Sequence, residues 1–146
     1  MANVRDVADY FLSKTVFADE AMMSNLKLQK LLYYIQGFHL ALFDTPIFED
    51  AIEAWRHGPV TPIIYHTFKS NGSNPIPCED CDKNFNELFR PEQIELLDEV
   101  YDVFGQYSAW KLREMTHEEP TWIMHESDAT IIPQDEMKEY FKTRIA

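Results

Sequence analysis

Apolar residues recur at the helical period in several separate stretches of the chain. The first stretch runs from Val4 to Leu12 and follows Asn3, whose side chain can cap a helix. The second begins after Ser24, another capping residue, and is apolar on most of its circumference. Its apolar series is Leu28, Leu31, Leu32, Ile35, Phe38 and Leu42. A helix apolar on most sides is normally surrounded by other elements, so we expect this one at the centre of the fold.

Four later stretches also carry helix signals. Thr61 and Pro62 read as an N-cap and a first helical residue. Pro91 and Pro133 can each open a helix, and Ser108 can cap a short one. The positions that we expect to face inward are Ile64, Tyr65, Phe68, Ile94, Leu97, Tyr101, Phe104, Leu112, Met115, Met137, Tyr140 and Phe141.

One short segment departs from the helical pattern. Residues 51–56 have no helical stripe and end at His57-Gly58-Pro59, where proline restricts the backbone. We interpret them as an extended segment, and as one half of a small hairpin whose other half would be Ile47-Phe48. The chain is therefore predicted to be a mainly α, compact single domain over residues 1–146. It would have about five to six helices and a short extended or hairpin element around residues 47–57.

Charge and composition narrow the function. The net charge is −12, of which residues 1–73 carry −2 (six basic, eight acidic) and residues 74–146 carry −10 (seven basic, seventeen acidic). An acidic half repels nucleic acid and suits a basic protein partner, although acidic faces also serve solubility alone. No apolar run approaches the roughly 20 residues of a membrane span, and the first residues lack the apolar core of a signal peptide. We therefore expect a cytoplasmic protein without a membrane contact, and the charge disfavours nucleic acid as its partner.

The stretch AWRHGPVTPIIY, residues 54–65, is the densest run of unusual residues. Trp55 and Arg56 are of the types enriched at protein-binding hot spots, and Gly58-Pro59 would shape the turn that presents them. The plainer alternative is that Trp55 packs in the core and His57 bonds a backbone carbonyl. The pattern alone leaves both interpretations open for these two residues.

Catalytic and metal sites receive little support from the residue spacing. His57, His66 and His117 are candidate bases or ligands, but no nucleophile elbow or paired-histidine motif accompanies them. Cys78 and Cys81 form half of a zinc-binding pattern, and no second pair completes it. We interpret these cysteines as incidental thiols. We therefore predict no catalytic residue, no bound metal and no cofactor.

Three separated motifs resemble a known family. LKLQKLLYYIQGFHLAL, AWRHGPVTPIIYHTFKSNG and LREMTHEEPTW, in this order, are similar to the SocA/GepA-type Panacea antitoxin domain. The resemblance extends over nearly the whole chain. It implies a small cytoplasmic protein, associated with phages or mobile elements, that binds and neutralises a toxin encoded by the adjacent gene. In one branch of the family, the antitoxin also delivers its toxin to the ClpXP protease as an adaptor.

The resemblance and the hot-spot argument together select the candidate partner-binding or motif residues. They are Gln29, Lys30, Tyr34, Trp55, Arg56, His57, Gly58, Pro59, Tyr65, Thr116, His117 and Trp122. For Lys30 we favour a packed stem with its ammonium group at the surface, and for Thr116-His117 a place at a helix end. The chain has Pro120-Thr121-Trp122 where many relatives are expected to have a Pro-Trp pair.

The hypothesis from the sequence is a toxin-neutralising binding protein that covers a functional surface of its toxin. Two alternatives stay open at this point. The first is a DNA-binding regulator of a phage or mobile element, in which a helix and hairpin would act as a winged helix. The second is a metal-dependent hydrolase that uses His57, His66 and His117.

Overall fold

The computed structural model describes residues 1–16 and 23–145. Within these ranges the chain is mainly α, as predicted, with eight α-helices, two 3-10 turns and one two-stranded hairpin. The elements are α1 (Val4–Val16), α2 (Asn25–Phe43), β1 (Glu53–Trp55), β2 (Gly58–Val60), α3 (Pro62–Phe68), η1 (Lys69–Asn71), α4 (Phe85–Leu88), α5 (Pro91–Phe104), α6 (Ala109–Thr116), α7 (Pro120–Ile123), η2 (Glu126–Asp128) and α8 (Gln134–Lys142). The number of helices exceeds the prediction because α4 and α7 are single turns, too short to produce a periodic pattern.

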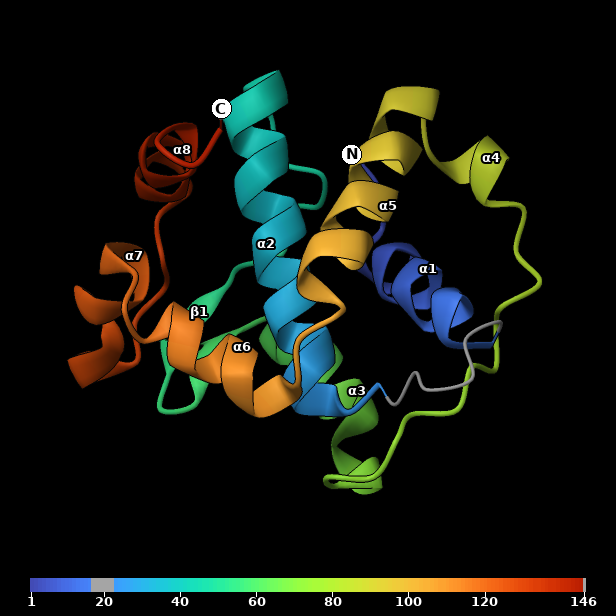
Figure 1. Ribbon diagram of the computed structural model, residues 1–146, viewed down its shortest axis with the longest axis horizontal. Coiled ribbons are helices and arrows are strands. Elements are labelled where there is room, and N and C mark those ends of the chain that lie inside the picture. The colour runs from blue at the N-terminus through green and yellow to red at the C-terminus, as the bar shows by residue number, and fades with distance from the viewer. Residues whose placement is uncertain (17–22, 146) are drawn as a thin grey trace.

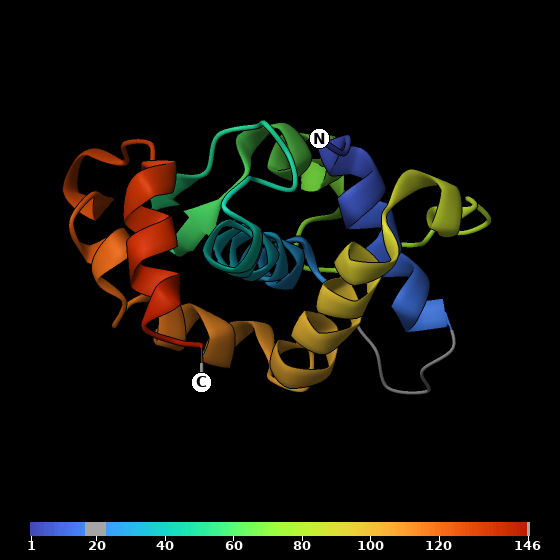
Figure 2. The ribbon, with the colours of Figure 1, turned by 90° about the horizontal axis from the view of Figure 1, so that it is seen from above.

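Helix α2 is the centre of the fold, as its apolar circumference predicts. It contacts α1, α3, α5, α6, α8 and β2, and in Figure 2 it is seen nearly end-on with the other elements arranged around it. Ser24 caps its start by accepting the N–H of Lys27 at 3.2 Å. Leu42, predicted to face inward, is instead 46 % exposed, because it lies at the end of α2 where a surface groove opens toward Val103 and Ile145.

The buried face of α5 is turned relative to the predicted one. Its buried residues are Gln93, Leu96, Leu97 and Val100. Ile94, Tyr101 and Phe104, which we expected to be fully inward, are only partly buried against the core. The apolar stripe is wide enough to allow either orientation, and the direction from which α5 packs against α2 determines which edge is covered.

The hairpin pairs different segments from those predicted. β1 pairs antiparallel with β2 across the turn Arg56-His57, with Ala54 opposite Pro59. The prediction that Ile47-Phe48 supplies the second strand is wrong, since Phe48 forms a bridge with Ala2 instead. The Ala54–Pro59 pair exchanges no ladder hydrogen bond through the Ala54 N–H, which donates to the carbonyl of Thr130 at 3.0 Å, so the missing N–H of Pro59 is tolerated there.

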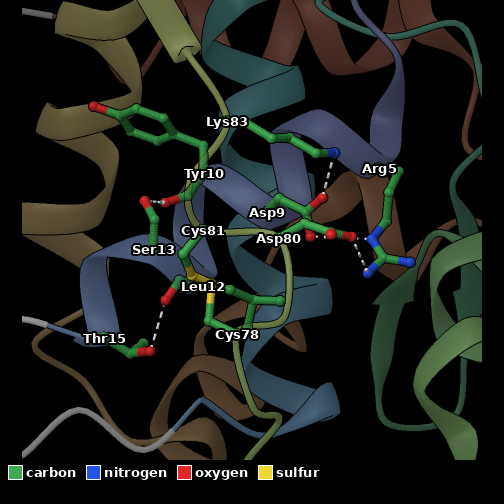
Figure 3. Close-up of a disulfide and its surroundings, with 10 residues drawn as sticks. All are labelled: Arg5, Asp9, Tyr10, Leu12, Ser13, Thr15, Cys78, Asp80, Cys81 and Lys83. Carbon is green, nitrogen blue, oxygen red and sulfur yellow. Dashed lines mark hydrogen bonds and ion pairs between the residues drawn. A yellow bond between two sulfur atoms is a disulfide. The ribbon is translucent and has the colours of Figure 1, made fainter.

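The loop before α4 is tied to α1. Lys83 Nζ lies 2.7 Å from Asp6 and 2.6 Å from the buried carboxylate of Asp9. Within this loop Cys78 and Cys81, whose Cα atoms are 5.7 Å apart, form a disulfide (Figure 3). The interpretation of both cysteines as incidental thiols is therefore wrong, because the loop folds back far enough to join them.

The helices carry no membrane-span signature. Over residues 1–16 and 23–145, no helix combines the length and the apolar character needed to cross a bilayer.

Candidate partner-binding site

The Gln-Lys pair of the first motif holds the hairpin onto α2. Gln29 accepts the N–H of Thr61 at 2.8 Å and donates to Asn25 at 2.9 Å. Lys30 donates from Nζ to the carbonyl oxygen of Pro59 at 3.0 Å. The predicted surface position of the Lys30 ammonium group is wrong, since the residue is 0 % exposed. The hairpin packs beside α2 (Figure 1), and Gly58 in it approaches the end of the Lys30 side chain.

The electrostatic environment of Lys30 is unfavourable to its charge. Burial, and then the nearby guanidinium of Arg113, lower the pKa of Lys30 to about 7. No carboxylate in the described part of the chain offsets this shift. Lys30 therefore stabilises the hairpin on α2 through its hydrogen bond and its packed stem, and not through an ion pair.

Gly58 has the backbone role that we predicted for it. Its φ angle is +111°, in the region that favours glycine. A Cβ atom at this position would lie 2.5 Å from Cε of Lys30 and 2.8 Å from Oγ1 of Thr116. The turn can therefore approach α2 and α6 this closely only because residue 58 has no side chain.

The side chains of Arg113, His57 and His117 lie close together at the turn. Arg113 on α6 donates from Nε to Nδ1 of His57 at 3.1 Å, and its guanidinium lies over the ring of Trp110 at 4.5 Å. Burial first, and Arg113 second, lower the pKa values of both His57 and His117. A proton on Nδ1 would break the bond from Arg113, so the geometry requires a neutral His57 ring.

The third motif is fixed to the hairpin by Trp122. Its indole N–H donates to the carbonyl oxygen of Trp55 at 2.7 Å. His117 stacks flat on the Trp122 ring, with centroids 3.9 Å apart and planes at 6°. His117 is the C-cap residue of α6, as expected from the sequence, and Thr116 before it is buried. The three motifs thus meet at one place in the fold.

Glu119 is a structural residue that the sequence analysis did not select. Its carboxylate accepts the hydroxyls of Tyr33 at 2.6 Å and Tyr34 at 2.8 Å. Burial raises the pKa of Glu119, while the two hydroxyl donors act in the opposite direction. The available signal was the pair of tyrosines off the main apolar face of α2, since a buried tyrosine hydroxyl needs a partner. Tyr34 is also stacked on Phe104, at 4.0 Å between centroids.

Removing the Glu119 carboxylate should leave the two tyrosine hydroxyls without their acceptor. We expect Glu119→Ala to lower the free energy of unfolding by about 2 kcal/mol. Glu119→Gln, which keeps one amide oxygen as an acceptor, should cost roughly half of that. Urea unfolding at pH 7 measures both variants. Equal stability of Glu119→Ala and the wild type would contradict the assigned role.

A groove of about 570 Å³ opens beside the hairpin turn. Trp55, Tyr65 and Trp110 form its aromatic walls, and Arg56, His57 and Lys69 also line it. Trp110 is 59 % exposed. Trp55 is half-buried. Its ring packs edge-on against that of Tyr65, with centroids 5.1 Å apart, and also lines the groove. It therefore combines the packing role and the surface role that the sequence left as alternatives.

The twelve candidate residues therefore separate into two layers. Those buried beneath the surface are Gln29, Lys30, Tyr34, Gly58, Pro59, Thr116 and Trp122. Those that line the groove and are at least partly exposed are Trp55, Arg56, His57 and Tyr65. His117 lies half-buried between the two layers.

Comparison with known proteins identifies the family. A sequence profile described as "Antitoxin SocA-like, Panacea domain" matches residues 28–123. The chain belongs to this family. The matched range contains the first motif from Leu28 onward, the other two motifs, the hairpin and Glu119, whereas α1 and α8 lie outside it.

One curated relative of this Panacea domain is Antitoxin SocA from Caulobacter vibrioides (strain NA1000 / CB15N). The two are 41 % identical over 74 residues, which is 51 % of this chain. The matched segment spans 39 % of the relative's length. No solved structure shows a significant match to the chain.

The three histidines of the hydrolase alternative do not form a ligand set in this Panacea domain. His57 is bonded to Arg113, whereas His66 lies against Trp55 and Tyr65, at centroid distances of 6.2 and 5.4 Å. Over residues 1–16 and 23–145, no three His, Cys, Asp or Glu side chains are grouped closely enough to hold a metal ion. The geometry therefore gives that alternative no support.

Proposed function

We propose that this Panacea domain is an antitoxin that neutralises the toxin encoded by its neighbouring gene through direct contact. The observation that carries the proposal is the groove beside the hairpin turn, where Trp55, Arg56 and Tyr65 are presented above a buried, hydrogen-bonded support. Aromatic and arginine side chains at a concave surface are typical of protein-binding hot spots.

The support beneath the groove favours tight binding. Lys30 and Trp122 each hold the backbone of the hairpin through one hydrogen bond, and Gln29 holds Thr61 directly after it. A surface that is already fixed before binding loses less conformational entropy when the partner arrives. We infer that neutralisation works by stoichiometric coverage of the toxin's functional surface and that this domain performs no catalysis.

The proposal also covers the extent of the domain, its location in the cell and the class of its partner. We place the domain over residues 1–146, because α1 and α8 both pack on α2 although they lie outside the matched range. The protein would act in the cytoplasm, in a phage or mobile-element context. By analogy with one branch of the family, the proposal includes delivery of the toxin to the ClpXP protease. The net charge of −12 disfavours nucleic acid as the main partner.

Co-expression with the product of the adjacent reading frame tests the proposal. We expect that product alone to arrest growth, and this chain to restore growth and co-purify with the product near one-to-one. Trp55→Ala should weaken the complex by at least about tenfold, as expected of a hot-spot residue. Met124→Ala, at a residue that is 68 % exposed and does not line the groove, is the matched control. A harmless neighbour that forms no complex would overturn the proposal.

A further inference from the structure

The groove differs in charge from the rest of the molecule. Its lining includes Arg56, His57 and Lys69 but no aspartate or glutamate. Three other grooves on the described surface each include at least one carboxylate: Glu87, Glu99, or Glu49 with Asp50. A cationic and aromatic groove is therefore present on a chain whose net charge is −12.

The cations at this groove are not neutralised by the domain itself. In the part of the chain that the structure describes, Arg56 and Lys69 have no ion-pair partner. The nearby carboxylates of Glu53 and Glu114 accept the indole N–H groups of Trp55 and Trp110, at 2.8 and 3.1 Å. These two acids orient the aromatic walls and do not line the groove itself.

We propose that the groove receives an acidic segment of the partner protein. An apolar or aromatic side chain of that segment would lie between Trp55, Tyr65 and Trp110, and an adjacent carboxylate would pair with Arg56 and Lys69. The inference deepens the proposed antitoxin function and rests on it. The expectation of a basic partner came from the acidic half of the chain, residues 74–146, whereas the groove is lined mainly by residues 24–73 and carries the opposite local charge.

Size and charge favour a peptide segment over nucleic acid. About 570 Å³ accommodates a few side chains, within the usual range for a built pocket. A duplex would need a wider cationic surface, and the −10 carried by residues 74–146 would repel its backbone. At physiological salt the screening length is roughly 8 Å, so the cations beside a bound carboxylate outweigh the distant acids.

A binding test that does not require the toxin uses random dodecapeptides displayed on phage and selected on the full-length chain. We expect the selected peptides to be rich in Asp or Glu next to Trp, Phe or Leu, although the chain as a whole is acidic. Synthetic versions should change the intrinsic fluorescence, because Trp55 and Trp110 line the groove.

Charge reversal then locates the binding. The double variant Arg56→Glu/Lys69→Glu should bind the selected acidic peptides at least about tenfold more weakly. Lys142→Glu on α8, which is exposed and outside the groove, is the matched control and should bind as the wild type does. Circular dichroism of each variant confirms that the fold is retained.

Three outcomes would overturn the inference: basic or neutral selected peptides, no selected peptide at all, or binding that charge reversal leaves unchanged. Binding of a labelled DNA duplex that the double variant abolishes would also overturn it, in favour of a nucleic-acid reader. The toxin complex separates the two proposals. A complex that tolerates charge reversal leaves the antitoxin function and removes the acidic-segment inference. Acidic peptides bound in the groove without any toxin complex remove the antitoxin function and leave only the preference of the groove for acidic segments.

Discussion

Lys30→Met is expected to be more stable than the wild type at pH 7 and to lose that advantage at higher pH. Burial holds the pKa of Lys30 at about 7, against 10.5 for an ordinary lysine. Between these values the unfolded chain binds more protons than the folded one, so the stability of the wild type rises with pH. Methionine fills similar space without a charge, although it leaves the Pro59 carbonyl without its donor.

The size of this effect follows from the pKa shift. From pH 7 to pH 9.5 the stability difference between the variant and the wild type should change by about 3 kcal/mol in favour of the wild type. Urea unfolding at the two pH values measures it. Lys111→Met, at an exposed position on α6, should follow the pH dependence of the wild type. A stability difference that does not change with pH would show that Lys30 is not buried in this way.

Gly58→Ala is expected to destabilise the domain by about 4 kcal/mol. The positive φ of residue 58 costs about 1–2 kcal/mol for alanine, and the forced contact with Lys30 and Thr116 costs about 1–3 kcal/mol more. The clash is expensive because both neighbours are buried and cannot move into solvent. The variant should also displace the turn Arg56-His57 and weaken partner binding.

Gly72→Ala provides the matched control for this prediction. Gly72 also has a positive φ, of 58°, but no atom lies within 4 Å of an added Cβ. Its replacement should cost only the backbone strain, about 1–2 kcal/mol. Thermal and urea unfolding of both variants would separate strain from contact. Similar losses at the two positions would contradict the close approach of Gly58 to α2 and α6.

The sequence by itself determined the features that depend on neighbouring residues. The caps at Ser24 and Ser108, the helix start at Pro91 and the central position of α2 all follow from side chains and periods within one turn or one helix. The backbone role of Gly58 belongs to the same class, because the sequence places it directly after the turn that it shapes. The three motifs also carry the family, and the profile match confirms that resemblance.

Only the tertiary structure decided which residues from distant segments meet. Lys30 is fully buried because the hairpin covers it, and Glu119 pairs with two tyrosines more than 80 positions away. The groove has a positive sign although the chain is acidic, because folding makes both Arg56 and Lys69 line it while the nearby acids Glu53 and Glu114 accept the indole N–H groups. The net charge is a sum over the whole chain, whereas binding depends on the charges that lie on one surface. Which charges share a surface is decided by how the chain packs.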